Sequence, residues 1–334
     1  MSSRTRFALA TLVTVLGCGG TQEQPADPLT ADPPEGAIEQ SNQGAGQTEL
    51  QRGIAFVKNE KYADAKPHIE KAVAANPKSA EAVYYLAVVH EKTGNRPGAE
   101  ENYKKALSLD PSFAEASQNL AALYLDDPPR PDEAIRLLKD ALQKSPDNAR
   151  LLQNLAYAHA LKKDYDNAAK YYEAALAKGG ESAIIRFALG SLLVEAKQPE
   201  KASPHLKKAL DATGDDPAML ATIGRMLAYT KDFGECVRAF DRALKIKADD
   251  PELFVRRGTC RHELKDEVGA KSDYQSAIRV NKDYAPGHYY LGLSLLTDKN
   301  QKKSAVAELE LAAKLGEGTP IGKAAQEKLG SFKK

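Results

Sequence analysis

The segment AYAHALKKDYDNAAKYYEAALAKG, residues 156–179, carries the pattern that decides the fold. Two runs of helix-forming residues flank the polar turn Lys163-Asp164, Asp166 can help to cap the second helix, and Gly179 ends it. Small and large residues recur along both runs at helical spacing, which lets two antiparallel helices approach closely and interlock. The segment therefore predicts one helix–turn–helix unit.

This unit returns every 34 residues along most of the chain. A fixed period of this length indicates stacked repeats, each of which buries its apolar face against its neighbours. Two columns are mainly alanine, a large apolar residue lies between them, and a fourth column of small residues lies upstream. The four columns are Ala65, Ala99, Ala168, Ala202 and Ala270; Ala72, Ala106, Ala175, Ala209, Ala243 and Ala277; Ile69, Tyr103, Tyr172, Leu206, Phe240 and Tyr274; and Gly53, Ala87, Ala121, Ala156, Gly190, Gly224, Gly258 and Gly292.

The pattern resembles the tetratricopeptide repeat, which has small residues at positions 8, 20 and 27, aromatic residues at 11 and 24, and proline near 32. The resemblance implies an all-α fold, a right-handed superhelical solenoid of about eight helix–turn–helix repeats. The turn DDPPRP adds one residue to the third repeat. We expect repeats at 46–79, 80–113, 114–148, 149–182, 183–216, 217–250, 251–284 and 285–318, and a capping helix at 319–334.

The first eighteen residues resemble the export signal of a bacterial lipoprotein. Arg4 and Arg6 precede an apolar stretch from Phe7 to Leu16, and Cys18 follows one residue later. We expect residues 1–17 to be a signal peptide and the thiol of Cys18 to be the site of lipid attachment. An ordinary secretory signal and an uncleaved anchor are the alternatives.

The next stretch, residues 18–45, is rich in Pro, Gly, Gln and Asp and has almost nothing to bury. Such a composition predicts a disordered tether behind the lipidated cysteine. Gly19 stands where an Asp often retains lipoproteins in the inner membrane, so the resemblance implies the periplasmic face of the outer membrane.

The composition argues against two classes of partner. The chain has 47 Lys and Arg against 46 Asp and Glu, spread along its length, so no large field favours nucleic acid. No apolar run reaches the roughly 18 residues that a membrane-spanning helix needs. We therefore expect no nucleic-acid partner, and contact with a membrane only through the N-terminal lipid.

The sequence shows no pattern of catalytic or metal-ligating residues. Four of the six histidines occupy equivalent positions in separate repeats, where they cannot share one metal. There is no Walker loop, GxSxG, HExxH or CxxC motif. We expect no catalytic site, no metal site and no cofactor. The paired histidines are His90 with His159 and His68 with His205.

Two cysteines in neighbouring repeats could form a disulfide or remain as two separate thiols. Cys236 lies at a small position of the sixth repeat and Cys260 on the first helix of the seventh, at similar distances from the turn between them. An oxidising compartment would allow a disulfide. Two independent buried thiols are favoured, because the position of Cys236 faces its own repeat.

The resemblance also implies a concave wall built mainly by the first helix of each repeat. Amides and aromatic rings on the second to fourth repeats suit an extended peptide, because a carboxamide can donate to one backbone carbonyl and accept from one N–H. An asparagine at this position is also common in the family. The predicted peptide-binding residues are Tyr84, Tyr85, Gln118, Asn119, Gln153, Asn154 and Tyr157; further along, the wall offers Arg225 and Arg256.

Together these features predict a non-enzymatic scaffold or adaptor lipoprotein that holds a protein or peptide partner in its groove. In architecture the chain is most similar to pilotin-type lipoproteins, which help secretin or pilus pores to assemble. That likeness implies a role in assembling an envelope machine. The alternative is a regulatory subunit of a peptidoglycan or polysaccharide enzyme complex.

Overall fold

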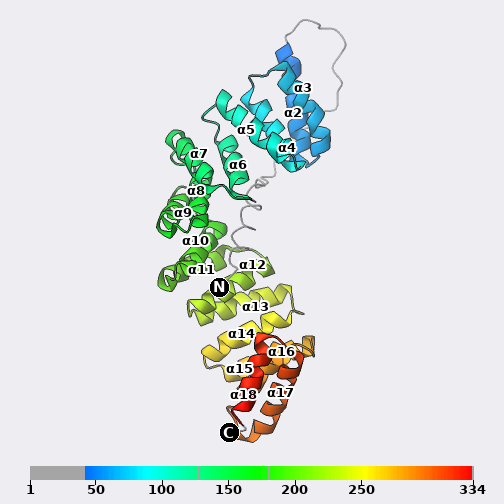
Figure 1. Ribbon diagram of the computed structural model, residues 1–334, viewed down its shortest axis with the longest axis vertical. Coiled ribbons are helices and arrows are strands. Elements are labelled where there is room, and N and C mark those ends of the chain that lie inside the picture. The colour runs from blue at the N-terminus through cyan, green and yellow to red at the C-terminus, as the bar shows by residue number, and fades with distance from the viewer. Residues whose placement is uncertain (1–41, 127, 180, 333–334) are drawn as a thin grey trace. The chain divides into compact units, whose positions relative to one another are not determined.

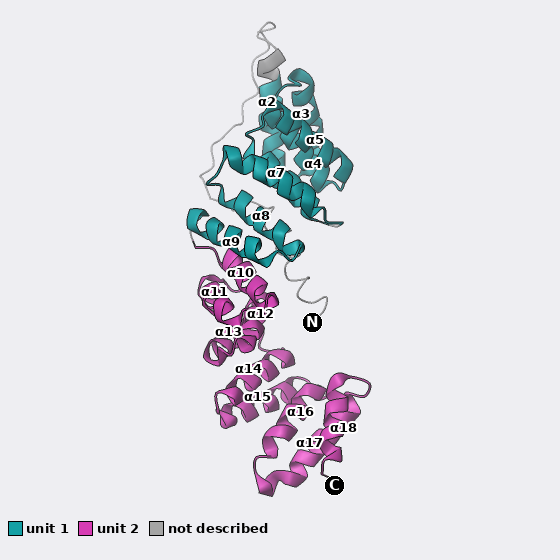
Figure 2. Cartoon of the chain, turned by 60° about the vertical axis from the view of Figure 1, so that its left-hand side comes forward, with its two compact units in different colours: residues 1–180 teal, residues 181–334 magenta. Residues whose placement is uncertain are grey.

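The computed structural model describes residues 42–126, 128–179 and 181–332, and every regular element among them is a helix (Figure 1). The chain divides into two compact units, residues 1–180 and 181–334 (Figure 2). None of the described helices is long and apolar enough to cross a membrane. The predicted signal peptide, Cys18 and the first part of the predicted tether lie outside the described residues.

The first unit consists of antiparallel helix pairs, and the second helix of one pair packs on the first helix of the next. Its pairs are α2 (Asn42–Lys58) with α3 (Tyr62–Ala75), α4 (Ala80–Lys92) with α5 (Arg96–Leu109), α6 (Ala114–Leu125) with α7 (Pro131–Lys144), and α8 (Ala149–Leu161) with α9 (Tyr165–Gly179).

The start of α2 corrects the predicted end of the tether. Residues 42–45 are helical, whereas the sequence predicted disorder up to residue 45. Residues 42–45 include no proline, so each of them keeps a backbone N–H for helical hydrogen bonding. Gly46 also packs closely on α3, since a Cβ at Gly46 would lie 2.7 Å from the Cβ of Ala75. This contact stabilises the first turns of α2.

The second unit is built in the same way and ends in one additional helix. Its elements are α10 (Ala183–Glu195) with α11 (Pro199–Ala212), α12 (Pro217–Tyr229) with α13 (Phe233–Ile246), α14 (Pro251–Glu263) with α15 (Glu267–Val280), and α16 (Ala285–Leu295), the 3₁₀ turn η1 (Lys299–Gln301) and α17 (Lys302–Leu315), followed by α18 (Pro320–Gly330). Helix α18 packs on α17 and α16 and buries Gly322 and Ala325. The prediction of an all-α solenoid of helical repeats is confirmed.

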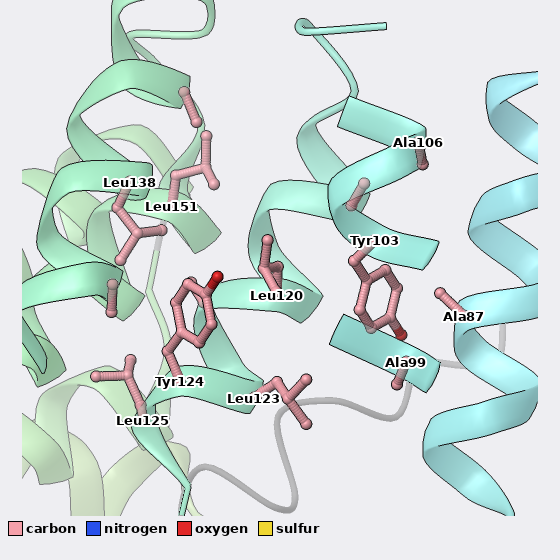
Figure 3. Packing of buried hydrophobic residues seen from close by; sticks show 14 of the residues in the cluster. Ala87, Ala99, Tyr103, Ala106, Leu120, Leu123, Tyr124, Leu125, Leu138 and Leu151 are labelled. Atoms are coloured by element: carbon pink, nitrogen blue, oxygen red, sulfur yellow. The ribbon is translucent and has the colours of Figure 1, made fainter. Parts of the chain in front are cut away.

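Each pair is held together by a large side chain from the second helix that fills a space left by small residues. Tyr103 of α5 is fully buried and points toward Ala87 and Ala99 (Figure 3). In the second unit the same contact joins Gly258 of α14 to Tyr274 of α15. Because the facing residue has only a methyl group at Ala87 and no side chain at Gly258, the two backbones approach closely and the large ring is removed from water.

The turn inside most pairs contains one residue in the left-handed region. These residues recur at a spacing of 34 and are mostly lysine, although glycine adopts this conformation at lower cost. Both helices of a pair fix the backbone around the residue, so packing outweighs its local preference. The residues are Glu60 (φ 58°), Gly94 (φ 81°), Lys163 (φ 60°), Lys197 (φ 59°), Lys231 (φ 64°) and Lys265 (φ 66°).

The close approach of α14 and α15 can be tested with one methyl group. A Cβ at Gly258 would lie 2.6 Å from Cε1 of Tyr274 and 3.1 Å from Cβ of Asp273. We expect Gly258→Ala to lower the free energy of unfolding by about 1–3 kcal/mol, because the core is overpacked. Urea unfolding followed by circular dichroism measures the change.

Gly234→Ala is the matched control, because no atom lies within 4 Å of a Cβ at this position of α13. It should leave stability unchanged or raise it by about 0.5 kcal/mol. If Gly258→Ala proves as stable as Gly234→Ala, the close approach does not hold the pair together.

Candidate protein-binding surfaces

In the first unit, a cluster of hydroxyl and amide groups lies where α4, α5 and α6 meet. Nδ2 of Asn119 donates to the hydroxyl of Tyr84 (3.1 Å) and to the hydroxyl of Tyr103 (3.3 Å). The Tyr103 hydroxyl donates in turn to Oε2 of Glu91 (2.7 Å). The amide of Asn119 is therefore engaged in joining three helices, which is a structural use that the sequence did not reveal.

Aromatic rings surround this cluster. The Tyr84 ring lies 5.2 Å from the Tyr85 ring in an edge arrangement and 4.8 Å from the Phe113 ring, centroid to centroid. Burial raises the pKa of Tyr84 to about 12 and also raises the pKa of Tyr85. Both hydroxyls are therefore protonated at neutral pH and can act as donors. Both rings remain partly exposed and offer a rigid aromatic contact to a ligand.

A second set of amides joins α6 to α8. Nδ2 of Asn154 donates to the backbone carbonyl of Gln118 (3.3 Å). Nε2 of Gln118 donates to Oδ1 of Asn148 (3.4 Å), the residue that caps α8. Gln118 and Asn154 are partly exposed, so they still border the surface.

Two predicted site residues on α8 are buried. Gln153 is 8% exposed and Tyr157 is 6% exposed. Burial raises the pKa of Tyr157 to about 12. The structure thus brings Tyr84, Tyr85 and Asn119 together, and Gln118 with Asn154, while Gln153 and Tyr157 lie within the packed interior. Contact of these seven residues with a peptide stays a prediction.

The second unit contains a cleft of about 300 Å³ that the sequence did not predict. Its walls come from α12 and α14, and Phe240 of α13 contributes to its floor. The composition of the wall could be read from the sequence, but the depth of the cleft could not. The lining residues are Pro217, Ala218, Ala221, Thr222, Arg225, Phe240, Lys247, Asp250, Glu252, Leu253 and Arg256.

A disulfide joins Cys236 of α13 to Cys260 of α14, with their Cα atoms 6.2 Å apart. The sequence favoured two independent thiols, and this interpretation was wrong. It assumed that the side chain of Cys236 faces its own repeat. Because α13 packs directly on α14, a side chain at this position also reaches the next repeat. Both cysteines are buried, at 0% and 2% exposure.

The histidines take part in local pairs. Nδ1 of His159 lies 2.8 Å from Oδ2 of Asp164, and Nδ1 of His288 lies 2.6 Å from Oε2 of Glu308. Within the part of the chain that the structure describes, no group of three or more His, Cys, Asp or Glu side chains is placed to hold a metal ion.

Comparison with family models gives one consistent result. Two models of the tetratricopeptide repeat match, one at residues 50–112, 89–149 and 120–183 and the other at residues 159–226. The matched region, residues 50–226, is more than half of the 334-residue chain.

Two curated relatives place this match in context. The chain is 26% identical over 200 residues to the type IV pilus assembly protein PilF of Pseudomonas aeruginosa, which covers 59% of this chain and 75% of that protein. It is 35% identical over 97 residues to the probable biofilm formation methyltransferase WspC of Pseudomonas putida. The second match covers 29% of this chain and only 22% of that protein.

Among solved structures, one described as a functional characterization of Pseudomonas aeruginosa pilF has a TM-score of 0.54 at 22% identity. The match covers 61% of this chain and 93% of that one. At 22% identity, this structural similarity supports the fold of the chain alone.

The disulfide predicts how many free thiols the unfolded chain has before and after reduction. Cys18→Ser leaves Cys236 and Cys260 as the remaining cysteines of the chain. Unfolded without reductant, this variant should give no free thiol with a thiol-reactive dye, and two after reduction. Two free thiols before reduction would show that the pair is not joined.

Proposed function

Because the chain belongs to the tetratricopeptide repeat family, we propose that it is a non-enzymatic scaffold that binds protein partners. The observation that carries this proposal is a division of roles within the helix pairs of the first unit. A second helix supplies a large buried residue, as α5 does with Tyr103, and the first helices α4, α6 and α8 carry partly exposed aromatic and amide side chains, namely Tyr84, Tyr85, Gln118, Asn119 and Asn154.

A role at the cell envelope is the finer part of the proposal. Three observations support it: the lipoprotein-like first eighteen residues, the disulfide, which persists mainly in oxidising compartments, and the similarity to PilF. We propose that lipid on Cys18 anchors the chain at the periplasmic face of a bacterial outer membrane. There it takes part in assembling a pilus- or secretin-type machine.

The test of protein binding uses a photo-reactive residue in the full chain. p-Benzoylphenylalanine at Tyr85, a partly exposed site on α4, should cross-link to a discrete partner in envelope preparations. The same residue at Val268 is the control, because Val268 is 84% exposed and lies on α15, the second helix of its pair.

Equal cross-linking from both sites, or none from Tyr85, would contradict partner binding by the first helices. Identification of the captured partner decides between two roles. A pilus or secretin component supports assembly. A peptidoglycan or polysaccharide enzyme whose rate changes when the chain is added supports the regulatory alternative.

The lipid anchor has a separate test. Cys18→Ser should remove incorporation of radiolabelled palmitate and move the chain from the membrane pellet to the soluble fraction. Thr21→Ala, three residues beyond the predicted attachment site, is the matched control and should behave as wild type. Unchanged partition of Cys18→Ser with the membrane would contradict lipid attachment at Cys18.

A further inference from the structure

We propose that the cleft between α12 and α14 binds an internal acidic segment of a protein partner. An apolar side chain of that segment would enter the cleft, and neighbouring carboxylates would pair with Arg225 and Arg256. This inference rests on the proposed protein-binding function and gives one surface of the chain a specific chemistry.

The floor and the rim of the cleft differ in character. Phe240, Leu253, Pro217 and Ala221 supply apolar surface, and the charged lining residues are Arg225, Lys247, Asp250, Glu252 and Arg256. Three cations against two carboxylates leave the lining with an excess of positive charge. An apolar floor beside basic groups matches a segment that presents an apolar side chain next to acidic ones.

Two adjacent arginines on α14, Arg256 and Arg257, differ in whether a ligand can bind them. Arg257 is fixed by the protein, since its guanidinium donates to both carboxylate oxygens of Asp273 (2.6 and 3.0 Å) and to Asp241 (2.6 Å). The side chain of Asp273 is 2% exposed. This network packs α14 against α13 and α15, and it uses every nitrogen of the Arg257 guanidinium.

Arg256 lines the cleft and is held only weakly by Glu252. It pairs with Glu252 one turn earlier at 3.1 Å, and the two side chains are 46% and 50% exposed. An exposed ion pair of this kind contributes little to stability, because water and salt screen it. A carboxylate of a ligand can therefore replace Glu252 at little cost, and the planar guanidinium can bind it through two parallel hydrogen bonds.

Arg225 comes to the same cleft from α12. Its Nη2 donates to Oγ1 of Thr222 (2.9 Å), whose hydroxyl donates to the backbone carbonyl of Ala218 (2.8 Å). Both Thr222 and Ala218 also line the cleft, so these contacts orient the guanidinium along its edge. Since α12 and α14 are in contact, one ligand can reach both arginines.

The two guanidiniums come from different helices. This arrangement favours a ligand segment with several carboxylates over a ligand with one C-terminal carboxylate. A chain that crosses from α12 to α14 meets Arg225 and Arg256 one after the other. The disulfide between α13 and α14 and the Arg257 network fix the walls before any ligand arrives. A preformed site loses less conformational entropy on binding, which raises its affinity.

The test measures fluorescence anisotropy with the detergent-solubilised full chain. The probe is fluorescein–Gly-Ser-Asp-Leu-Glu-Asp-Leu-Glu–amide, and its matched neutral form has Asn and Gln in place of Asp and Glu. We expect the acidic probe to bind wild type at least tenfold more tightly than the neutral one. The double variant Arg225→Gln/Arg256→Gln should bind the acidic probe at least tenfold more weakly than wild type.

Arg279→Gln is the control variant, because Arg279 is an exposed arginine on α15 outside the cleft, and it should leave the affinity unchanged. Circular dichroism and thermal melting establish that the double variant is folded. Should it not fold, Arg225→Lys/Arg256→Lys replaces it and should still weaken binding, because lysine lacks the planar fork.

Four results would overturn the inference: equal binding of acidic and neutral probes, unchanged affinity of a folded double variant, binding only when the amide is replaced by a free C-terminal acid, and no binding at all. None of them would affect a cross-link formed from Tyr85 in the other unit. Failure of the cleft is therefore distinguishable from failure of the proposed function.

Discussion

The fold depends on one contact, the insertion of a large side chain from the second helix of a pair into a space left by small residues of the first. Tyr103 against Ala87 and Tyr274 against Gly258 are examples, and all four residues are buried. The contact uses one face of the first helix. Another face carries the partly exposed aromatic, amide and guanidinium groups, so the same packing that stabilises a pair also determines which side chains a partner can meet.

The sequence was sufficient for the fold because packing repeats every 34 residues and small and large residues alternate in register with it. It was not sufficient for the backbone of the turns. Lys163 and Lys197 adopt φ near 60°, a conformation that a lysine in the sequence does not predict. The sequence left the pairing of Cys236 with Cys260 open and favoured two separate thiols, since a position in a repeat does not show which neighbouring helix its side chain reaches.

For the site, the sequence identified the side chains of the wall but not their use. Asn119 was expected to meet a peptide, and the structure shows its amide donating to two tyrosine hydroxyls. Gln153 was expected in the groove and is buried. A single sequence cannot separate an amide that binds a ligand from one that joins helices, because both need the same residue at the same position. The two units consequently offer different chemistry, hydroxyl and amide groups in the first and guanidinium groups around an apolar floor in the second.

The central claim is that partners bind to the first helices of the pairs. Amide hydrogen exchange of the full chain, with and without the partner captured through Tyr85, tests it most directly. The account predicts slower exchange in first helices such as α4, α6 and α8, or α12 and α14, and unchanged exchange in α5, α7, α13 and α15. Protection confined to the second helices would contradict it.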